Sequence, residues 1–260
     1  MPRSRWTGWT PATQSDGWLC RVSERSTTTA PAARLPPALR PPWRRDSPWA
    51  MHSCWMAQDG FTGTLQLRIK HDEGLPPSML QAEIRTAVSL CASAGVPLFI
   101  NDHVQVARDE HAPGVHLGQE DLLQLDDEQR DALREPNGFA LGISSHSLWE
   151  LARARSMAPR YIACGPVWPT TTKDMPWLPQ GLDRLRWWCR MAGAPVVAIG
   201  GILRPDQAAA AVASGAGGVC VLRGLGPDPA ASVPLFLQAM ASASRPDAGA
   251  SVRIGELVPR

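Results

Sequence analysis

Three polar side chains recur at alternate positions of one short apolar run. Gln66, Arg68 and Lys70 would point to one face of a strand, because successive strand side chains point to opposite faces. Cations that face a protein interior are costly unless an anion meets them. The run therefore predicts an anion site, and a solvent-facing strand edge is the alternative interpretation of this motif taken alone.

Two carboxylates follow neighbouring apolar runs, at the points where the predicted strands end. Asn101 and Asp102 come directly after Leu98–Ile100, and Asp121 lies shortly after Val115–Leu117. Each carboxylate alone is more typical of a loop or a helix cap. Together with the two cations of the first run they favour Mg²⁺ bridging to a phosphate, because Mg²⁺ takes one or two carboxylates plus phosphate oxygens and water.

His116 and His146 lie near these strand ends and are expected to have different roles. His116 lies in the middle of a predicted strand, which favours a hydrogen-bonded core residue over a base. Ser144 ends the following strand, and His146, two residues further on, has the chemistry of an acid or a base. Nothing in this spacing marks a nucleophilic Ser–His pair.

A second set of anion-binding groups occurs later in the chain. Thr170 and Thr172 stand in a hydroxyl-rich loop that Lys173 closes, and Gly200 and Gly201 follow a later strand before a helix. Hydroxyls, an ammonium group and a backbone without Cβ atoms all suit phosphate oxygens. The sequence thus predicts two anion sites and one metal, and both lysines of the chain fall among these groups.

The elements that must position these groups alternate between strand and helix. The apolar runs are continuous, as expected of parallel strands buried on both faces, and helical patterns lie between most of them. Repeated βα units without a dinucleotide fingerprint favour an α/β fold of the (β/α)8 TIM-barrel type, with chemistry at the C-terminal ends of the strands. The predicted strands are Thr64–Ile69, Pro97–Ile100, Gly114–Leu117, Ala140–Ile143, Tyr161–Ala163, Pro195–Ile199 and Gly218–Leu222.

Composition divides the chain into three parts. Residues 1–60 hold eight arginines against four acidic residues, six of the 11 tryptophans and many prolines, and they show no strand pattern. We expect a disordered or non-native segment over 1–60, a barrel over 61–243 and a flexible tail over 244–260. The net charge of +2 and the absence of a long apolar run predict no nucleic-acid and no membrane partner. Six scattered cysteines favour reduced thiols and a cytoplasmic location.

From about Gly63 to Leu225 the chain resembles the thiamine phosphate synthase family. Six motifs carry the resemblance in the family's order, and this makes it highly specific. They are Gln66-Leu-Arg68-Ile-Lys70, Phe99-Ile-Asn101-Asp102, Gly114-Val-His-Leu-Gly-Gln-Glu-Asp121, Gly142-Ile-Ser144, Gly165-Pro-Val-Trp-Pro-Thr170-Thr-Thr172-Lys173 and Ala198-Ile-Gly200-Gly201-Ile202.

The resemblance implies a transferase that acts on two small molecules. It would couple 4-amino-5-hydroxymethyl-2-methylpyrimidine diphosphate to a thiazole phosphate and release pyrophosphate, through a pyrimidine carbocation that the thiazole nitrogen captures. Matching each motif to the family's roles assigns the residues as follows: Asp102 and Asp121 to Mg²⁺; Arg68, Lys70, Asn101 and Lys173 to the departing pyrophosphate; Gln66 and Ser144 to the pyrimidine; and Thr170, Thr172 and Gly201 to the thiazole phosphate. Leu222 and Arg223, after the last strand, are also expected among the substrate-binding residues.

Two departures from the family pattern keep alternatives open. Residues 1–60 lack the family's first strand and helix, so the first βα unit is expected to be missing or degenerate, with open edges between the first and last remaining strands. Arg223 replaces a small residue and would either reinforce phosphate binding or crowd the site. The alternative interpretations are a thiazole tautomerase-like relative and an inactive truncated barrel. The sequence is also compatible with a homo-oligomer.

Overall fold

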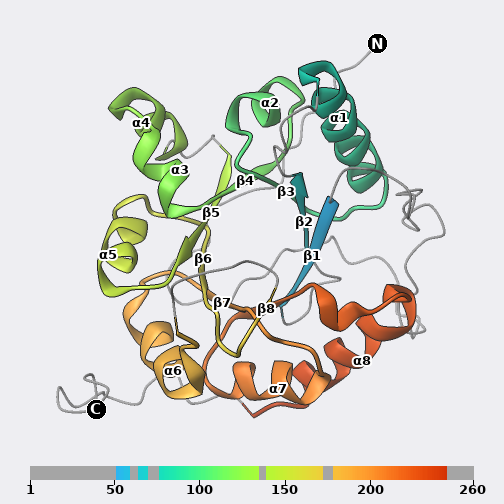
Figure 1. Ribbon diagram of the computed structural model, residues 1–260, viewed down its shortest axis with the longest axis vertical. Coiled ribbons are helices and arrows are strands. Elements are labelled where there is room, and N and C mark those ends of the chain that lie inside the picture. Colours follow the sequence, from blue (N-terminus) through green and yellow to red (C-terminus); the bar gives the residue numbers. More distant parts are fainter. Residues whose placement is uncertain (1–50, 59–63, 70–75, 135–138, 172–177, 245–260) are drawn as a thin grey trace, which may run out of the picture. The chain divides into compact units, whose positions relative to one another are not determined.

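A closed ring of eight strands forms the centre of the fold in the computed structural model (Figure 1). The structure describes residues 51–58, 64–69, 76–134, 139–171 and 178–244, and for 51–58 it describes the backbone alone. The strands are β1 (Met51–Gln58), β2 (Thr64–Ile69), β3 (Leu98–Asn101), β4 (Gly114–Leu117), β5 (Ala140–Ser145), β6 (Tyr161–Cys164), β7 (Val196–Ile199) and β8 (Gly218–Val221).

Helices surround the strands in chain order, from α1 beside β2 round to α8 (Figure 1). Local sequence explains their ends: Ser147 caps α5 by accepting the N–H of Glu150 at 3.3 Å, and Pro205 opens α7 at a first-turn position. The helical elements are α1 (Pro77–Ser93), α2 (Val104–Asp109), α3 (Gln119–Gln124), α4 (Asp127–Arg134), α5 (Leu148–Ser156), α6 (Gly181–Met191), α7 (Pro205–Ala213), the short 3-10 turn η2 (Arg223–Leu225) and α8 (Pro229–Ala241).

Strands β2 to β8 are parallel, and each pairs with the next in chain order. All seven apolar runs predicted as strands are strands in the structure, with ends that differ by no more than two residues. The α/β barrel expected from this alternation is therefore confirmed in its main features. Because the strands run in one direction, their C-terminal ends and the loops that follow them gather at one end of the ring.

The first strand departs from the regular barrel pattern. β1 pairs antiparallel with both β2 and β8: Trp55 lies opposite Leu65 on one side and Val221 on the other. The prediction that residues 1–60 contain no strand is therefore wrong, and so is the prediction of open edges between the first and last parallel strands. Residues 59–63 join β1 to β2, in place of the long crossover that joins parallel neighbours.

Alternation along β2 separates the barrel interior from the helix layer. Leu67 and Ile69 are buried in an apolar cluster with Leu80 and Ile84 of α1, so they face outward from the ring. Gln66 and Arg68 therefore face inward, as their spacing predicts. The interior below the polar side chains is filled by a second apolar cluster that contains Phe99, Tyr161, Ala163, Val197 and Cys220.

The predictions about the terminal segments, the cysteines and membrane spans have different outcomes. Residues 1–50 and 245–260 lie outside the described residues, while β1 belongs to the barrel although it falls in the segment 1–60. Cys91, Cys164 and Cys189 are free thiols, but Cys220 is disulfide-bonded, so the prediction of reduced thiols is wrong for that residue. No helix among the described residues is long and apolar enough to cross a membrane.

Candidate functional site

The residues that the sequence assigns to chemistry come from strand interiors and from the loops after the strands. Lys70, Thr172 and Lys173 lie outside the described residues, so the structure does not place them. The others lie on or directly after successive parallel strands: Gln66 and Arg68 on β2, Asn101 and Asp102 at the end of β3, Asp121 in the first turn of α3, Ser144 on β5, Thr170 after β6, Gly201 after β7, and Leu222 and Arg223 after β8.

Gln66 and Asn101 form a buried amide pair between β2 and β3. The Gln66 Nε2 donates to the Asn101 Oδ1 at 2.8 Å, and both side chains are buried. This bond fixes the orientation of the Asn101 amide and leaves its two N–H groups for other acceptors. The pair therefore presents hydrogen-bond donors inside the barrel, on the same face as Arg68.

His116 is the centre of a buried polar chain that joins β4, β5 and β6. Its Nδ1 lies 2.8 Å from the Tyr161 hydroxyl and its Nε2 lies 2.8 Å from the Ser144 Oγ. Burial lowers the pKa of His116 to about 3, with the charges of Arg68 and His146 acting in the same direction. The imidazole is therefore neutral at pH 7, and the prediction of a hydrogen-bonded core histidine is confirmed.

Two tautomers of the neutral ring fit this chain of bonds. Burial raises the pKa of the Tyr161 phenol, so the phenol keeps its proton and can either donate to the His116 Nδ1 or accept from it. With the ring proton on Nε2, Tyr161 donates to Nδ1 and Nε2 donates to the Ser144 Oγ, which leaves the Ser144 hydroxyl proton for another acceptor. With the ring proton on Nδ1, both bonds run in the opposite direction. Because the His116 pKa is about 3, the ring is too weak a base to make Ser144 a nucleophile.

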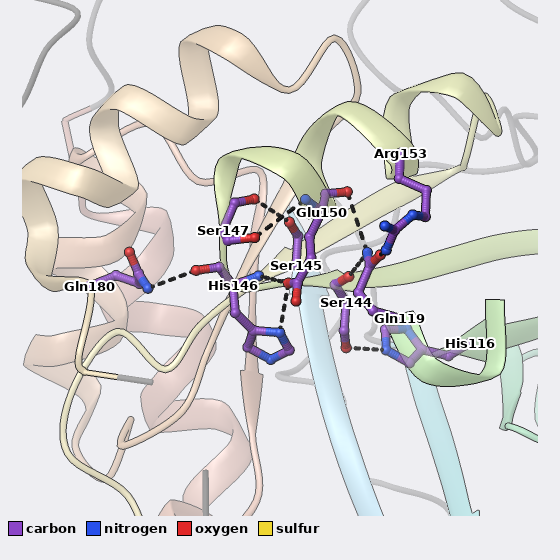
Figure 2. A network of polar contacts seen from close by, with 9 residues as sticks. All are labelled: His116, Gln119, Ser144, Ser145, His146, Ser147, Glu150, Arg153 and Gln180. Carbon is purple, nitrogen blue, oxygen red and sulfur yellow. Dashed lines mark hydrogen bonds and ion pairs between the residues drawn. The ribbon is translucent and has the colours of Figure 1, made fainter. Parts of the chain in front are cut away.

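The backbone of Ser144 is fixed from the side opposite to its hydroxyl (Figure 2). Gln119, at the start of α3, donates from its Nε2 to the Ser144 carbonyl at 2.7 Å. The same amide accepts at its Oε1 from the Arg153 guanidinium of α5 at 2.9 Å. The hydroxyl of Ser144 is thus held between a buried histidine and a strand end that two helices anchor.

His146 belongs to the part of this network at the beginning of α5, which Gln119 joins by donating to the Glu150 carbonyl at 3.4 Å (Figure 2). Its backbone N–H and its Nδ1 contact the Glu150 Oε2 at 2.5 and 3.0 Å, and its carbonyl accepts from the Gln180 Nε2 at 3.2 Å. Burial alone would raise the pKa of Glu150, but the hydrogen bonds from His146 and Ser147 outweigh it and hold that pKa below its ordinary value. The charged carboxylate therefore holds the loop after β5 against α5, and Gln180 joins the same loop to the start of α6.

The two candidate metal ligands lie after adjacent strands. Asp102 has a left-handed backbone, with φ of 68°, and its N–H donates to the His116 carbonyl at 3.0 Å, which joins the end of β3 to β4. Asp121 accepts the Gly118 N–H at its Oδ2 at 3.2 Å. Among the described residues no group of three or more His, Cys, Asp or Glu side chains is placed to hold a metal ion.

The loops after β6 and β7 pack tightly against each other. The backbone N–H groups of Val167 and Trp168 donate to the carbonyls of Ile199 and Gly200 at 2.9 and 3.1 Å. Gly201 has φ of 71°, and a Cβ at this position would lie 2.6 Å from the carbonyl oxygen of Pro169. Only glycine therefore fits the turn after β7 without displacing the loop after β6.

Several side chains that hydrogen-bond around the candidate site are not predicted from the sequence. Tyr161, Gln119 and Gln180 act through partners that are 45, 25 and 34 positions away, and no local pattern marks them. Thr171 accepts from Arg223 at 2.8 Å, although the sequence motif assigns its two neighbours instead. The one signal in the sequence is the run of three threonines, which does not distinguish among its members.

An α/β barrel with amides, carboxylates, hydroxyls and a guanidinium at its strand ends belongs to the class of barrel enzymes that bind phosphorylated small molecules. The family model described as thiamine monophosphate synthase matches residues 52–225, and the chain belongs to this family.

The chain also resembles individual members over most of their length. A thiamine-phosphate synthase of Rhizobium etli is 43% identical over 180 residues, which are 68% of this chain and 84% of the relative. One of Neisseria meningitidis is 46% identical over 161 residues, which are 62% of this chain and 75% of the relative. The solved thiamine phosphate pyrophosphorylase of Pyrococcus furiosus superposes with a TM-score of 0.56 at 26% identity, over 66% of this chain and 81% of the other.

Proposed function

We propose that this chain is a thiamine-phosphate synthase, a transferase that couples 4-amino-5-hydroxymethyl-2-methylpyrimidine diphosphate to thiazole phosphate. The products are thiamine phosphate and pyrophosphate. The observation that carries the proposal is 43% identity to a thiamine-phosphate synthase over 84% of that enzyme's length. The fold of the Pyrococcus furiosus pyrophosphorylase supports it independently.

In this proposal the first step is departure of pyrophosphate from the pyrimidine methylene carbon. The C–O bond breaks, its electron pair leaves with the pyrophosphate oxygen, and the pyrimidine carries the positive charge. Arg68 and the N–H groups of Asn101 are the described donors that would bind the developing negative charge, together with Lys70 and Lys173. Donors fixed before the reaction stabilise such charge most effectively, and the Gln66–Asn101 bond of 2.8 Å supplies this fixation.

The second step is capture of the carbocation by the thiazole nitrogen, which forms the C–N bond. No protein base is required at the carbon, because the nitrogen lone pair attacks directly. The Ser144 hydroxyl would donate to a pyrimidine ring nitrogen, and Gln66 would contact the same ring. Neutral His116 supports this role in the tautomer that carries the proton on Nε2, because this N–H donates to the Ser144 oxygen and leaves the Ser144 proton for the pyrimidine.

We also propose Mg²⁺ as the cofactor, held by Asp102 and Asp121. The donor set fits, because both are carboxylates that follow adjacent strands, and Mg²⁺ prefers one or two carboxylates plus phosphate oxygens and water. When bound, the ion would neutralise charge on the diphosphate.

The first βα unit of the family's barrel is, in our proposal, replaced by the β1–β2 hairpin. The antiparallel pairing of β1 with β2 and β8 supports this interpretation, since a parallel first strand would require a crossover helix. We further propose a cytoplasmic location, in keeping with a biosynthetic role.

Pyrophosphate release tests the function and its metal requirement. With Mg²⁺ and both substrates, the chain should release pyrophosphate, and removal of either substrate or of Mg²⁺ with EDTA should abolish release. Asp102→Ala should lower kcat by about 100-fold or more, because a charge-stabilising group at the leaving pyrophosphate is lost. Asp109→Ala is the matched control, since this carboxylate is exposed at the end of α2 and bonds only to Gln105 among the described contacts.

The outcomes separate the function from the residue assignments. Full activity in Asp102→Ala would reject that residue as a metal ligand. Absence of pyrophosphate release by the unaltered chain, together with failure to support growth of a thiamine-requiring strain, would reject the synthase itself.

A further inference from the structure

Gln180 is a buried polar residue with no part in the two proposed chemical steps. It stands directly before α6, at a position where a short polar side chain often caps a helix, but its own side chain forms no cap bond. Its Nε2 instead donates to the His146 carbonyl at 3.2 Å, in the loop after β5 (Figure 2). The residue is 8% exposed. Because a buried amide is costly without a partner, this bond holds the side chain in one orientation.

The backbone of Gln180 closes the loop that follows β6. Its N–H donates to the Pro166 carbonyl at 2.7 Å, and the next N–H, of Gly181, donates to the Val167 carbonyl at 3.0 Å. The chain therefore leaves β6 and returns to α6 at the same place. Thr170, which the family motif assigns to the thiazole phosphate, lies on the outgoing part of this loop. Gln180 thus stands at the base of a loop that carries a hydroxyl assigned to substrate binding.

The acceptor of the Gln180 bond belongs to the loop assigned to the other substrate. His146 lies two residues after Ser144, which the family motif assigns to the pyrimidine. The Glu150 Oε2 holds His146 through its backbone N–H and its Nδ1, and Gln119 holds the Ser144 carbonyl at 2.7 Å. The His146 carbonyl is therefore a fixed point beside the pyrimidine side of the site.

The two loops continue beyond the point where strand pairing ends. β5 and β6 pair as far as Ser145 and Cys164, and the Gly165 N–H donates to the Ser145 carbonyl at 3.4 Å. Beyond this point the Gln180 side chain joins the loops, through a bond between residues 34 positions apart. Its donor and its acceptor are both anchored, so the bond sets the distance between the two loops.

We propose that Gln180 is a positioning residue for the transfer step, because its bond to His146 fixes the loop for thiazole phosphate against the loop for the pyrimidine. This inference rests on the proposed synthase function and adds a residue to that same site. The thiazole nitrogen must meet the pyrimidine carbon for the C–N bond to form, and a displacement of about 1 Å can cost about 100-fold in rate. Each substrate keeps the contacts of its own loop, so the rate rather than the binding depends on Gln180.

Steady-state kinetics of the full chain with Mg²⁺ and both substrates test the proposal. Gln180→Met removes the donor but keeps an unbranched side chain of similar length and both backbone N–H bonds. It should lower kcat by about 10-fold or more, while KM for each substrate stays within about threefold. Calorimetric titration with thiazole phosphate should still find one site per chain, which shows that the fall in kcat is not a loss of folded protein.

Gln81→Met is the matched control. Gln81 donates from α1 to the Glu110 Oε1 at 2.7 Å, so this variant also deletes an amide bond, but in the helix layer beside β2. Its kcat should stay within about twofold of the unaltered chain. Gln180→Asn is a second variant, because it keeps a polar amide that is one methylene too short to reach His146, and it should repeat the loss of kcat.

The outcomes separate the role of Gln180 from the synthase function. If the unaltered chain releases no pyrophosphate with both substrates, the synthase and this role are both rejected. If the unaltered chain is active and both Gln180 variants keep kcat within about twofold, the role of Gln180 alone is rejected. An equal fall of kcat in Gln81→Met also rejects it, and so does a rise in KM without a fall in kcat, because the side chain would then act on binding rather than on alignment.

Discussion

Burial determines which proton donors the site contains. His116, with its pKa lowered to about 3, is a neutral ring at every pH where the enzyme would work, and its neighbour Tyr161 remains a phenol. The two together hold the Ser144 hydroxyl through a chain of hydrogen bonds between neutral groups. A residue that sequence patterns treat as part of the core thereby positions the Ser144 hydroxyl.

The depressed pKa of His116 predicts a pH-dependent stability. The unfolded chain binds a proton at this residue below about pH 6.5 and the folded chain only below about 3, so the free energy of unfolding should fall as pH falls between these values. The slope would approach about 1.4 kcal/mol per pH unit. Urea unfolding between about pH 5 and 7 measures it, and His116→Gln should have a smaller slope than the unaltered chain.

This pH range is chosen because the carboxylates titrate mainly below it. Two equal slopes would show that His116 is not buried as a neutral ring. His111→Gln is the control, since this histidine lies outside the buried chain of hydrogen bonds, and it should leave the slope unchanged.

Single residues also show where sequence reasoning reaches its limit. The inward orientation of Gln66 and Arg68 follows from strand alternation, and the structure confirms it. The bond between Arg223 and Thr171 joins residues 52 positions apart, and only the assembled ring of strands brings them together. Spacing along the chain carries no information about such pairs.

At the scale of elements, the loops after β6 and β7 act as one unit because their backbones leave no room between them. The carbonyls of Ile199 and Gly200 accept N–H groups from the loop after β6. Any displacement of the β7 turn therefore moves the threonine hydroxyls as well. The position of these hydroxyls depends on the absence of a side chain at Gly201.

Gly201→Ala should lower kcat/KM for thiazole phosphate by at least about 10-fold. The added Cβ requires a left-handed alanine and would lie 2.6 Å from the Pro169 carbonyl oxygen, so the loop must shift. Gly95→Ala is the matched control, because Gly95 has φ of 66° and a Cβ added there would meet nothing within 4 Å. Both variants should lose similar stability from backbone strain, and only Gly201→Ala should lose activity. Equal activity in the two would show that the contact with Pro169 does not matter for binding.

The strands differ in how well the sequence predicts them. Strands β3 to β8 are mostly apolar runs buried on both faces, and β2 alternates apolar with polar residues, so the sequence pattern indicates all seven. Residues 51–58 have no such run, and prolines and arginines precede them. β1 is a strand because the exposed backbone groups of β2 and β8 provide a ladder on each side, and this is a property of the tertiary structure.

For the molecule as a whole, closure of the barrel depends on β1. The parallel sheet from β2 to β8 would have two open edges without it, and unpaired strand edges promote association with other chains. The family match begins at residue 52, within β1, and β1 runs antiparallel to both of its neighbours in the ring. The residues that follow β8 therefore depend on β1, because β1 pairs with β8 and closes the ring.

Trp55→Pro tests this dependence. The Trp55 backbone lies opposite Leu65 and Val221, and proline removes an N–H from a strand that has a neighbour on each side; a ladder carbonyl left without its donor costs about 1 to 3 kcal/mol. Trp55→Val removes the same side chain but keeps the N–H. Thermal unfolding should therefore show a lower Tm for proline than for valine by about 2 to 12 °C, at roughly 2 to 4 °C per kcal/mol for a domain of this size. Equal Tm values would mean that β1 does not close the ring in solution, and the proline variant would then keep its pyrophosphate release.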